Sequence, residues 1–254
     1  MKFYTTMSDQ LIKWVLVVSL LANGLALGVG LWSVQRLGGW KYLWYRFRTQ
    51  GIGASYVHRK SQLDMLPTKR ADIVMWGNSL TRQGEWQEWL PEFVVCNRGI
   101  EGDHVAGLMA RMDQVVALQP RWVLLMIGVN DLLFHEPDFV LSQYELLLQK
   151  LVAALPQSHI IVQSLLPVNN EVRPLGISNE DIDRVNEGLV RLSARYGLRY
   201  LDLHALLCDA QGRLDARFTR DGIHINGAAY RIWVQAIRAE LQTSHSFDGK
   251  AKGQ

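Results

Sequence analysis

The hydrophobic pattern divides the chain into one long apolar run and a region of short alternating runs. Residues 11–32 are apolar except for Lys13, Ser19 and Asn23. About 20 such residues are enough for an α-helix to cross a bilayer. Lys13 lies near the end of the run, where its side chain can reach the lipid headgroups. The pattern therefore predicts a transmembrane helix over residues 11–32, preceded by a short tail of residues 1–10.

Aromatic residues flank this run on both sides, as they do at membrane interfaces. They are Trp14, Trp32, Trp40, Tyr42, Trp44 and Tyr45. Residues 41–48 alternate basic and aromatic side chains, which is typical of an interfacial segment. Two other interpretations are weaker. The run is long for a cleaved signal peptide and no small-x-small site closes it, and it is also long for the core helix of a soluble domain.

In the rest of the chain, short runs rich in β-branched and aromatic residues alternate with helical patterns. The predicted strands are residues 73–76, 93–96, 122–127, 159–163 and 199–203. The predicted helices are residues 104–118, 138–155, 180–196 and 226–241. Five apolar strands separated by helices indicate an α/β fold in which a parallel sheet is covered on both faces. Such a sheet places its ligand site at the carboxyl ends of its strands.

The same pattern indicates where the parts of the chain begin and end. Residues 33–70 are basic and aromatic at first and then mixed and polar, which predicts a juxtamembrane and linker segment. The main domain is then expected over residues 71–242. Residues 243–254 are expected to form a disordered tail.

Composition and charge narrow the partners. With 48% hydrophobic and 20% charged residues, the chain is neither a disordered segment nor a disulfide scaffold. Eight of its 27 Lys and Arg residues, but one of its 24 Asp and Glu residues, lie in residues 1–60, which leaves the remainder with a net charge of −4. Basic residues beside an apolar run suit lipid headgroups. We therefore expect a membrane partner and no nucleic-acid partner.

The two cysteines, Cys96 and Cys208, lie far apart in the sequence. Their spacing suggests neither a zinc cluster nor a disulfide. Because their neighbours are apolar, we expect both to be buried thiols.

Small polar residues collect at four predicted strand ends or helix starts. Residues 77–79 follow the first strand, residues 97–103 the second and residues 128–131 the third, while Asp221 and His224 precede the last helix. Because the carboxyl ends of parallel strands meet at one edge of a sheet, we expect these groups to converge there. Their convergence predicts a catalytic site.

The residue types in these groups suit acyl transfer. His224 follows Asp221 by three positions, so the carboxylate can orient the imidazole and fix its tautomer. Ser79, near a predicted helix start, is the candidate nucleophile for this base. The oxyanion formed by its attack needs hydrogen-bond donors. The candidates are the backbone N–H groups of Ser79 and Gly102 and the side-chain amide of Asn130.

These four groups, in this order, resemble the blocks of the SGNH (GDSL-type) hydrolases, a family of flavodoxin-like α/β esterases. The residues that match the blocks are Ser79, Gly102, Asn130, and Asp221 with His224. The resemblance covers about residues 71–241. It implies a three-layer α/β/α sandwich with a five-stranded parallel sheet, and an ester hydrolase that needs neither a metal nor an organic cofactor.

Two features of the first block separate this chain from related patterns. Asn78 stands where the family's commonest block, G-D-S, has aspartate. The amide can still form a hydrogen bond across the turn but carries no charge, which bears on the subfamily more than on activity. Thr81 replaces the second glycine of G-x-S-x-G, so an ordinary α/β-hydrolase elbow is disfavoured.

Three functions are compatible with this sequence. The first is hydrolysis of carboxylic esters, either short acyl or acetyl esters of glycans or lysolipids, through an acyl-enzyme on Ser79. The second is transfer of the acyl group to a cell-envelope glycan by the same triad. The third, an inactive tethered binding module, is disfavoured because all five motif residues are present. The acyl chain and alcohol depend on the loops at residues 84–90, 129–137 and 167–178.

Two observations give opposite orientations in the membrane. Lys and Arg are more numerous on the C-terminal flank of the apolar run, which favours a cytoplasmic main domain. An N-terminal anchor ahead of a hydrolytic domain most often holds that domain outside the cytoplasm. We expect a single-pass membrane protein with its catalytic domain on the periplasmic or another extracytoplasmic side, and the orientation stays open.

Overall fold

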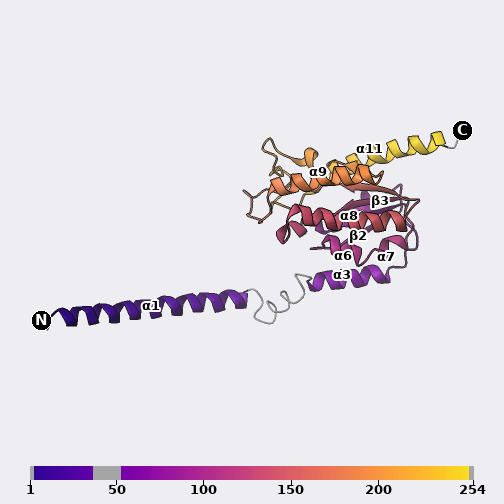
Figure 1. Cartoon of the computed structure of the whole chain (residues 1–254). Helices are drawn as coiled ribbons and strands as arrows, with labels where there is room; N and C mark the ends of the chain where they lie inside the picture. Colours follow the sequence, from indigo (N-terminus) through magenta and orange to yellow (C-terminus); the bar gives the residue numbers. More distant parts are fainter. Residues whose placement is uncertain (1–2, 37–52, 252–254) are drawn as a thin grey trace. The chain divides into compact units, whose positions relative to one another are not determined.

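The computed structural model describes residues 3–36 and 53–251 and divides the chain into two compact units (Figure 1). The first unit contains helix α1 (Phe3–Arg36). Its segment Gln10–Val34 is long and apolar enough to cross a membrane, and none of it is buried. A signal sequence satisfies the same description. Four of the aromatic residues assigned to the interface lie outside the described residues: Trp40, Tyr42, Trp44 and Tyr45.

The second unit, from Ala54 onward, is built around a five-stranded parallel sheet in the order β2-β1-β3-β4-β5. The strands are β1 (Ile73–Gly77), β2 (Val95–Gly99), β3 (Trp122–Met126), β4 (His159–Gln163) and β5 (Arg199–Leu201). After β1 the chain runs to β2 on one side and then crosses to β3 on the other. The strand order therefore reverses beside β1, and ligands of such sheets bind at the reversal.

Helices cover both faces of the sheet, in the three-layer α/β/α sandwich that was expected. The helices of this unit are α3 (Ala54–Met65), α4 (Ser79–Arg82), α5 (Trp86–Trp89), α6 (Val105–Met109), α7 (Asp113–Val116), η1 (Asp131–Leu133), α8 (Pro137–Ala154), α9 (Asn179–Arg195), α10 (His204–Leu207) and α11 (Gly227–Ala251). On β1, Val74 and Trp76 pack with α6 to α9, whereas Ile73 and Met75 pack with α5, α10 and α11. Helices α8 and α9 lie side by side on the first of these faces (Figure 1).

Local sequence explains where the two long helices beside the sheet begin. Pro137 opens α8, at a position where its missing N–H has no helical partner to lose. Ser178 caps α9 by accepting a hydrogen bond from the Asp181 N–H at 3.0 Å. Buried apolar residues then recur on α8 at three- and four-residue spacing and fix its inner face. They are Val140, Tyr144, Leu147, Leu148 and Leu151.

Residues 54–65 are helical, which corrects the linker expected over residues 33–70. Helix α3 packs through Leu63, which is buried, and through Asp64, whose carboxylate accepts a hydrogen bond from the Gln114 side chain. Because most of its other residues are polar, the hydrophobic pattern does not reveal so narrow a contact. The compact unit therefore starts at Ala54 and not at residue 71.

The last helix is also longer than predicted. Helix α11 continues past Leu241 to Ala251, so a disordered tail from residue 243 is wrong for the part of that segment that the structure describes. No proline occurs between residues 227 and 251. Without one, no residue type forces the helix to end earlier.

The segment predicted as one helix over residues 104–118 forms two short helices, α6 and α7. Between them, Arg111 is fully buried and turns toward the sheet. Its guanidinium donates to the Asp103 carboxylate at 2.8 Å and to the Gly77 carbonyl oxygen at 3.2 Å. A buried cation needs such partners, and these contacts favour a break in the helix at this position.

Strand β2 lies two to three residues later than the pattern predicts, because it contains the polar residues Asn97 and Arg98. Cys96, in the same strand, is buried as expected. Cys208 is only partly buried, which corrects its expected burial, and both thiols are free.

Candidate active site

Ser79 is the first residue of α4, and Asn78 alone separates it from the end of β1 at Gly77. Asn78 caps this helix, since its side-chain oxygen accepts a hydrogen bond from the Leu80 N–H at 3.0 Å. An amide oxygen is sufficient for this cap, so the missing aspartate charge is not needed to hold the turn. The cap and the short helix together aim Ser79 outward from the carboxyl end of β1.

Glycine is required at the turn before Ser79. A Cβ on Gly77 would lie 2.3 Å from the Met126 carbonyl oxygen and 2.3 Å from the Thr81 hydroxyl oxygen. Both separations are far below van der Waals contact, and the first involves the backbone of the neighbouring strand β3. Any side chain at this position would push the nucleophile's turn away from the sheet.

His224 and Asp221 come from the loop that precedes α11. His224 Nδ1 lies 2.7 Å from Asp221 Oδ2, and His224 Nε2 lies 3.0 Å from Ser79 Oγ. A carboxylate can only accept, so Nδ1 carries the proton of the neutral ring and Nε2 is free to accept the Ser79 hydroxyl hydrogen. The structure thus joins Asp221, His224 and Ser79 in one chain of hydrogen bonds, although Ser79 and His224 are 145 positions apart in the sequence.

The loop that carries the histidine is held from both sides. Gly222 has a φ of +84°, and a Cβ there would lie 2.5 Å from the Asn169 carbonyl oxygen. The Gly222 N–H donates to the Thr219 hydroxyl at 2.9 Å, and its carbonyl accepts from the Asn169 N–H at 2.8 Å. These contacts fix the backbone between Asp221 and His224, and with it the orientation of both side chains.

The Asp221 carboxylate is strongly stabilised in its ionised form. Partial burial by itself would raise its pKa, but hydrogen bonds outweigh this effect and lower the pKa to about 2. The donors are the His224 side chain and the backbone N–H groups of His224 and Ile223, at 2.7, 2.8 and 3.1 Å. Asp221 therefore stays charged throughout the neutral and mildly acidic range.

The three candidate oxyanion donors line one cavity with the nucleophile. This cavity has a volume of about 500 Å³, and Ser79, Gly102, Asn130 and His224 all contribute to its wall. In the part of the chain that the structure describes, the backbone N–H groups of Ser79 and Gly102 have no hydrogen-bond acceptor. Gly102 reaches its position with a φ of +70°. The Asn130 side-chain N–H donates to the Asp103 carbonyl oxygen at 2.9 Å.

The rest of the cavity wall is partly apolar, and five of its residues come from two of the three loops that were expected to shape it. The further lining residues are Gln83, Glu101, Leu133, Arg173, Pro174, Leu175, Ile177 and Ile223. The loop at residues 84–90 does not contribute, because its central Trp86 is 1% exposed and packs in the core. The sequence did not identify Ile223 as a lining residue, although it lies directly beside His224.

A buried polar group supports the loops that carry Gly102 and Asn130. The Asp131 carboxylate accepts hydrogen bonds from the Val105 N–H at 3.2 and 3.3 Å. It thereby caps α6 rather than its own following turn, and it links the loop after β2 to the loop after β3. Among the described residues, no group of three or more His, Cys, Asp or Glu side chains could hold a metal ion.

We expect the Asp131→Asn variant to change how stability depends on pH. Burial raises the pKa of Asp131 to about 7, from an ordinary value of 3.8. The folded chain then binds this proton more tightly than the unfolded chain, so the free energy of unfolding falls as pH rises from about 4 to 7. The variant should lose the part of the slope that comes from Asp131 and gain at most about 4 kcal/mol at pH 8. Thermal unfolding from pH 4 to 8 tests this, and equal slopes in both proteins would contradict it.

Comparison with known proteins agrees with this geometry. Residues 50–232 match the GDSL-like Lipase/Acylhydrolase family. An acetylxylan esterase of Geobacillus stearothermophilus is 27% identical over 159 residues, which cover 58% of this chain and 71% of that protein.

Two solved structures illustrate the shared fold. A protein from Streptococcus pneumonia has a TM-score of 0.71 at 21% identity, covering 78% of this chain and 98% of that one. A GDSL-like lipase from Bacteroides thetaiotaomicron has a TM-score of 0.62 at 20% identity, covering 75% and 98%. At such low identities these structures establish the fold, while the family match spans most of the sequence. The chain therefore belongs to the GDSL-like lipase/acylhydrolase family and is an ester hydrolase.

Proposed function

We propose that the chain is a membrane-anchored serine esterase that hydrolyses carboxylic esters through an acyl-enzyme on Ser79. The observation that carries this proposal is the hydrogen-bond chain from Asp221 through His224 to Ser79, with links of 2.7 and 3.0 Å. Its end opens into a cavity that also contains the free N–H groups of Ser79 and Gly102. A nucleophile, an oriented base and oxyanion donors are the parts that acyl transfer requires.

The reaction begins when Ser79 Oγ attacks the ester carbonyl carbon and His224 Nε2 takes the hydroxyl proton. The carbonyl oxygen becomes an oxyanion and accepts hydrogen bonds from the Ser79 and Gly102 N–H groups and the Asn130 amide. His224 then gives its proton to the leaving alcohol oxygen, which leaves the acyl group on Ser79. A water molecule, deprotonated by His224, attacks the acyl carbon. The bond from this carbon to Ser79 Oγ then breaks, His224 returns the proton to Ser79, and the carboxylic acid leaves.

Asp221 acts through His224 and does not touch the substrate. It keeps the Nδ1 proton in place, and its negative charge stabilises the imidazolium that forms while His224 holds the Ser79 proton. A carboxylate with a pKa of about 2 stays ionised, and so gives this stabilisation, throughout the neutral and mildly acidic range.

For the substrate, we favour short acyl esters, such as acetyl esters of a glycan, over long-chain lysolipids. The 27% identical relative is described as an acetylxylan esterase. The cavity offers an apolar wall from Leu133, Leu175 and Ile177, which suits an acyl group, beside the polar side chains of Gln83, Glu101 and Arg173. A volume of about 500 Å³ accommodates a sugar-sized molecule.

The anchor and the domain limits belong to the same proposal. Helix α1, with its apolar segment Gln10–Val34, would hold the catalytic unit at the membrane, and that unit begins at Ala54. We favour an extracytoplasmic catalytic unit, where glycan esters of the cell envelope are available.

A fluorophosphonate probe tests the nucleophile directly. An activated serine displaces fluoride from phosphorus and keeps the phosphonyl group, which peptide mass spectrometry can locate. We expect the label on Ser79, no label in Ser79→Ala, and much slower labelling in His224→Ala because the base is missing. Ser61→Ala, an exposed serine of α3, serves as the matched control and should label normally. Equal labelling rates in the wild-type and His224→Ala proteins would contradict the proposal.

A further inference from the structure

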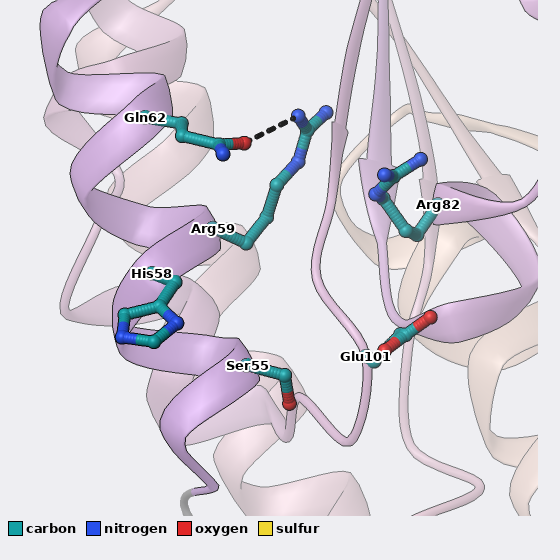
Figure 2. A pocket seen from close by; sticks show the side chains of 6 residues that line it. All are labelled: Ser55, His58, Arg59, Gln62, Arg82 and Glu101. Atoms are coloured by element: carbon teal, nitrogen blue, oxygen red, sulfur yellow. Dashed lines mark hydrogen bonds between the residues drawn. The ribbon is translucent and has the colours of Figure 1, made fainter.

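A second pocket lies beside the ester cavity and is not used by the proposed reaction. Its volume is about 190 Å³. Its lining residues are Ser55, His58, Arg59, Gln62, Arg82 and Glu101. Figure 2 shows Arg59 reaching from α3 and Arg82 reaching from α4 toward the same space. Most of the wall therefore comes from α3, a helix that the sequence pattern presents as a linker.

Within the described residues, neither arginine of this pocket, Arg59 or Arg82, forms an ion pair. Arg59 Nη1 and Nη2 make only long hydrogen bonds, of 3.4 Å to Gln62 and 3.5 Å to the Asn97 carbonyl oxygen, and its Nε is buried without an acceptor. Among the described residues, the Arg82 guanidinium has neither a hydrogen bond nor an ion pair. Arg98, in β2 behind them, is 3% exposed, and its Nε also lacks an acceptor.

These guanidinium groups also repel one another. Burial lowers the pKa of Arg59, and the charges of Arg82 and Arg98 lower it further. By contrast, Arg111 nearby is compensated by the Asp103 carboxylate at 2.8 Å. Partly buried cations without a counter-charge are costly. A bound anion would supply the missing charge and the missing hydrogen-bond acceptors.

We propose that this pocket binds the phosphate group of an ester substrate. Guanidinium groups match the oxygen spacing of phosphate and donate to it in pairs. Arg59 and Arg82 share the pocket with one carboxylate, that of Glu101. Arg98 adds a third positive charge that acts on Arg59. A phosphate monoester carries up to two negative charges and three terminal oxygens, so it balances this excess better than a single carboxylate.

The pocket is close enough to the ester cavity for one molecule to occupy both. Glu101 lines both cavities, and its neighbour Gly102 is a candidate oxyanion donor. Arg82 follows Ser79 by three positions on α4, which puts their Cβ atoms about 5–6 Å apart. Given the proposed esterase function, on which this step rests, the substrate is a short acyl ester whose phosphate lies a few bonds from the scissile bond.

Binding of phosphate can be measured without any catalysis. With the full chain in detergent, calorimetric titration with glycerol 3-phosphate should show binding that weakens about tenfold in Arg59→Gln and in Arg82→Gln. Arg191→Gln, an exposed arginine of α9, is the matched control and should bind normally. Glu101→Gln should tighten binding about threefold, a gain that misfolding cannot produce. Absent binding, or equal binding in wild-type and Arg59→Gln proteins, would overturn the inference.

Hydrolysis then links the pocket to the substrate. The kcat/KM ratio of acetylglycerol 3-phosphate to acetylglycerol should exceed one in the wild-type protein and fall about tenfold in Arg59→Gln. The same pair built on an acetylated hexose, with and without phosphate, shows whether a lipid-type or a glycan-type phosphate is preferred. A ratio that Arg59→Gln leaves unchanged overturns the inference and leaves the esterase intact. Phosphate binding that requires Arg59, without hydrolysis of any ester, supports the pocket and contradicts the proposed function.

Discussion

The Ser79→Ala variant is expected to lose about 10⁴-fold or more in kcat toward a short-chain nitrophenyl ester. The reason is structural: among the described residues, Ser79 Oγ is the partner of His224 Nε2, at 3.0 Å. Alanine removes this oxygen and leaves the base without a proton to take. The loss should appear in kcat, because the cavity walls that bind the ester are unchanged. Steady-state hydrolysis, followed by release of nitrophenol, measures it.

The thermal stability of the Ser79→Ala protein is the control, because it shows whether the variant is folded. Ser79 is only partly buried, and the hydrogen bond that it would lose is the one to His224. The unfolding temperature should therefore stay within a few degrees of the wild-type value. Because nitrophenyl esters are chemically activated, an acetylated sugar is measured beside them. Turnover of either ester at near wild-type rates by a folded Ser79→Ala protein would remove the nucleophile assignment.

Much of the sheet could be predicted because its strands are short apolar runs between polar segments. Strand β4 (His159–Gln163) has the bounds that the pattern predicts. Strands β1 and β3 each end one residue away from their predicted end. Strand β2 is the exception. Asn97 belongs to it and uses its amide to hold the Thr81, Arg82 and Gly84 carbonyl oxygens, at 3.1 Å each. From the sequence alone, a polar residue that makes such long-range contacts is predicted to lie in a loop.

The residues of the candidate active site could be predicted from the order of the sequence motifs. The second pocket beside it could not, because it depends on tertiary contacts. The motif residues sit at strand ends or helix starts, and the rules of parallel sheets bring those positions together. The second pocket, lined by Arg59 and Arg82, has no motif in the sequence that would predict it. Arg59 and Arg82 are 23 positions apart, and they meet only because α3 packs on the domain through Leu63. Local pattern cannot predict that docking, since one buried side chain on a polar helix is a weak signal.

The Asp221→Asn variant is expected to lower kcat about 10³- to 10⁴-fold while Ser79 and His224 stay in place. An amide has the size of the carboxylate but no charge, so it cannot stabilise the imidazolium. It can also present its NH₂ group to Nδ1 and so favour the tautomer with the proton on Nε2, where the Ser79 hydrogen must go. The variant therefore tests orientation and charge without removing a side chain. Comparison with Ser79→Ala should show a smaller loss, because the nucleophile remains.

The pH dependence of activity and stability, compared between the wild-type and Asp221→Asn proteins, tests whether the Asp221 carboxylate is held in its ionised form. Asp221, with a folded pKa of about 2 against an ordinary value of 3.8, contributes stability that is fully present above about pH 4 and is lost as pH falls toward 2. Because Asp221 stays ionised above about pH 4, its protonation cannot account for a loss of wild-type activity above that pH, and the loss of stability should appear only at lower pH. Asp221→Asn should lack the loss of stability between pH 4 and 2 that wild type shows. Activity profiles and thermal unfolding over pH 2 to 8 measure both. If wild-type activity and stability were lost together near pH 4, the carboxylate would not be held in its ionised form, and the hydrogen-bond chain from Asp221 to Ser79 could not work as derived.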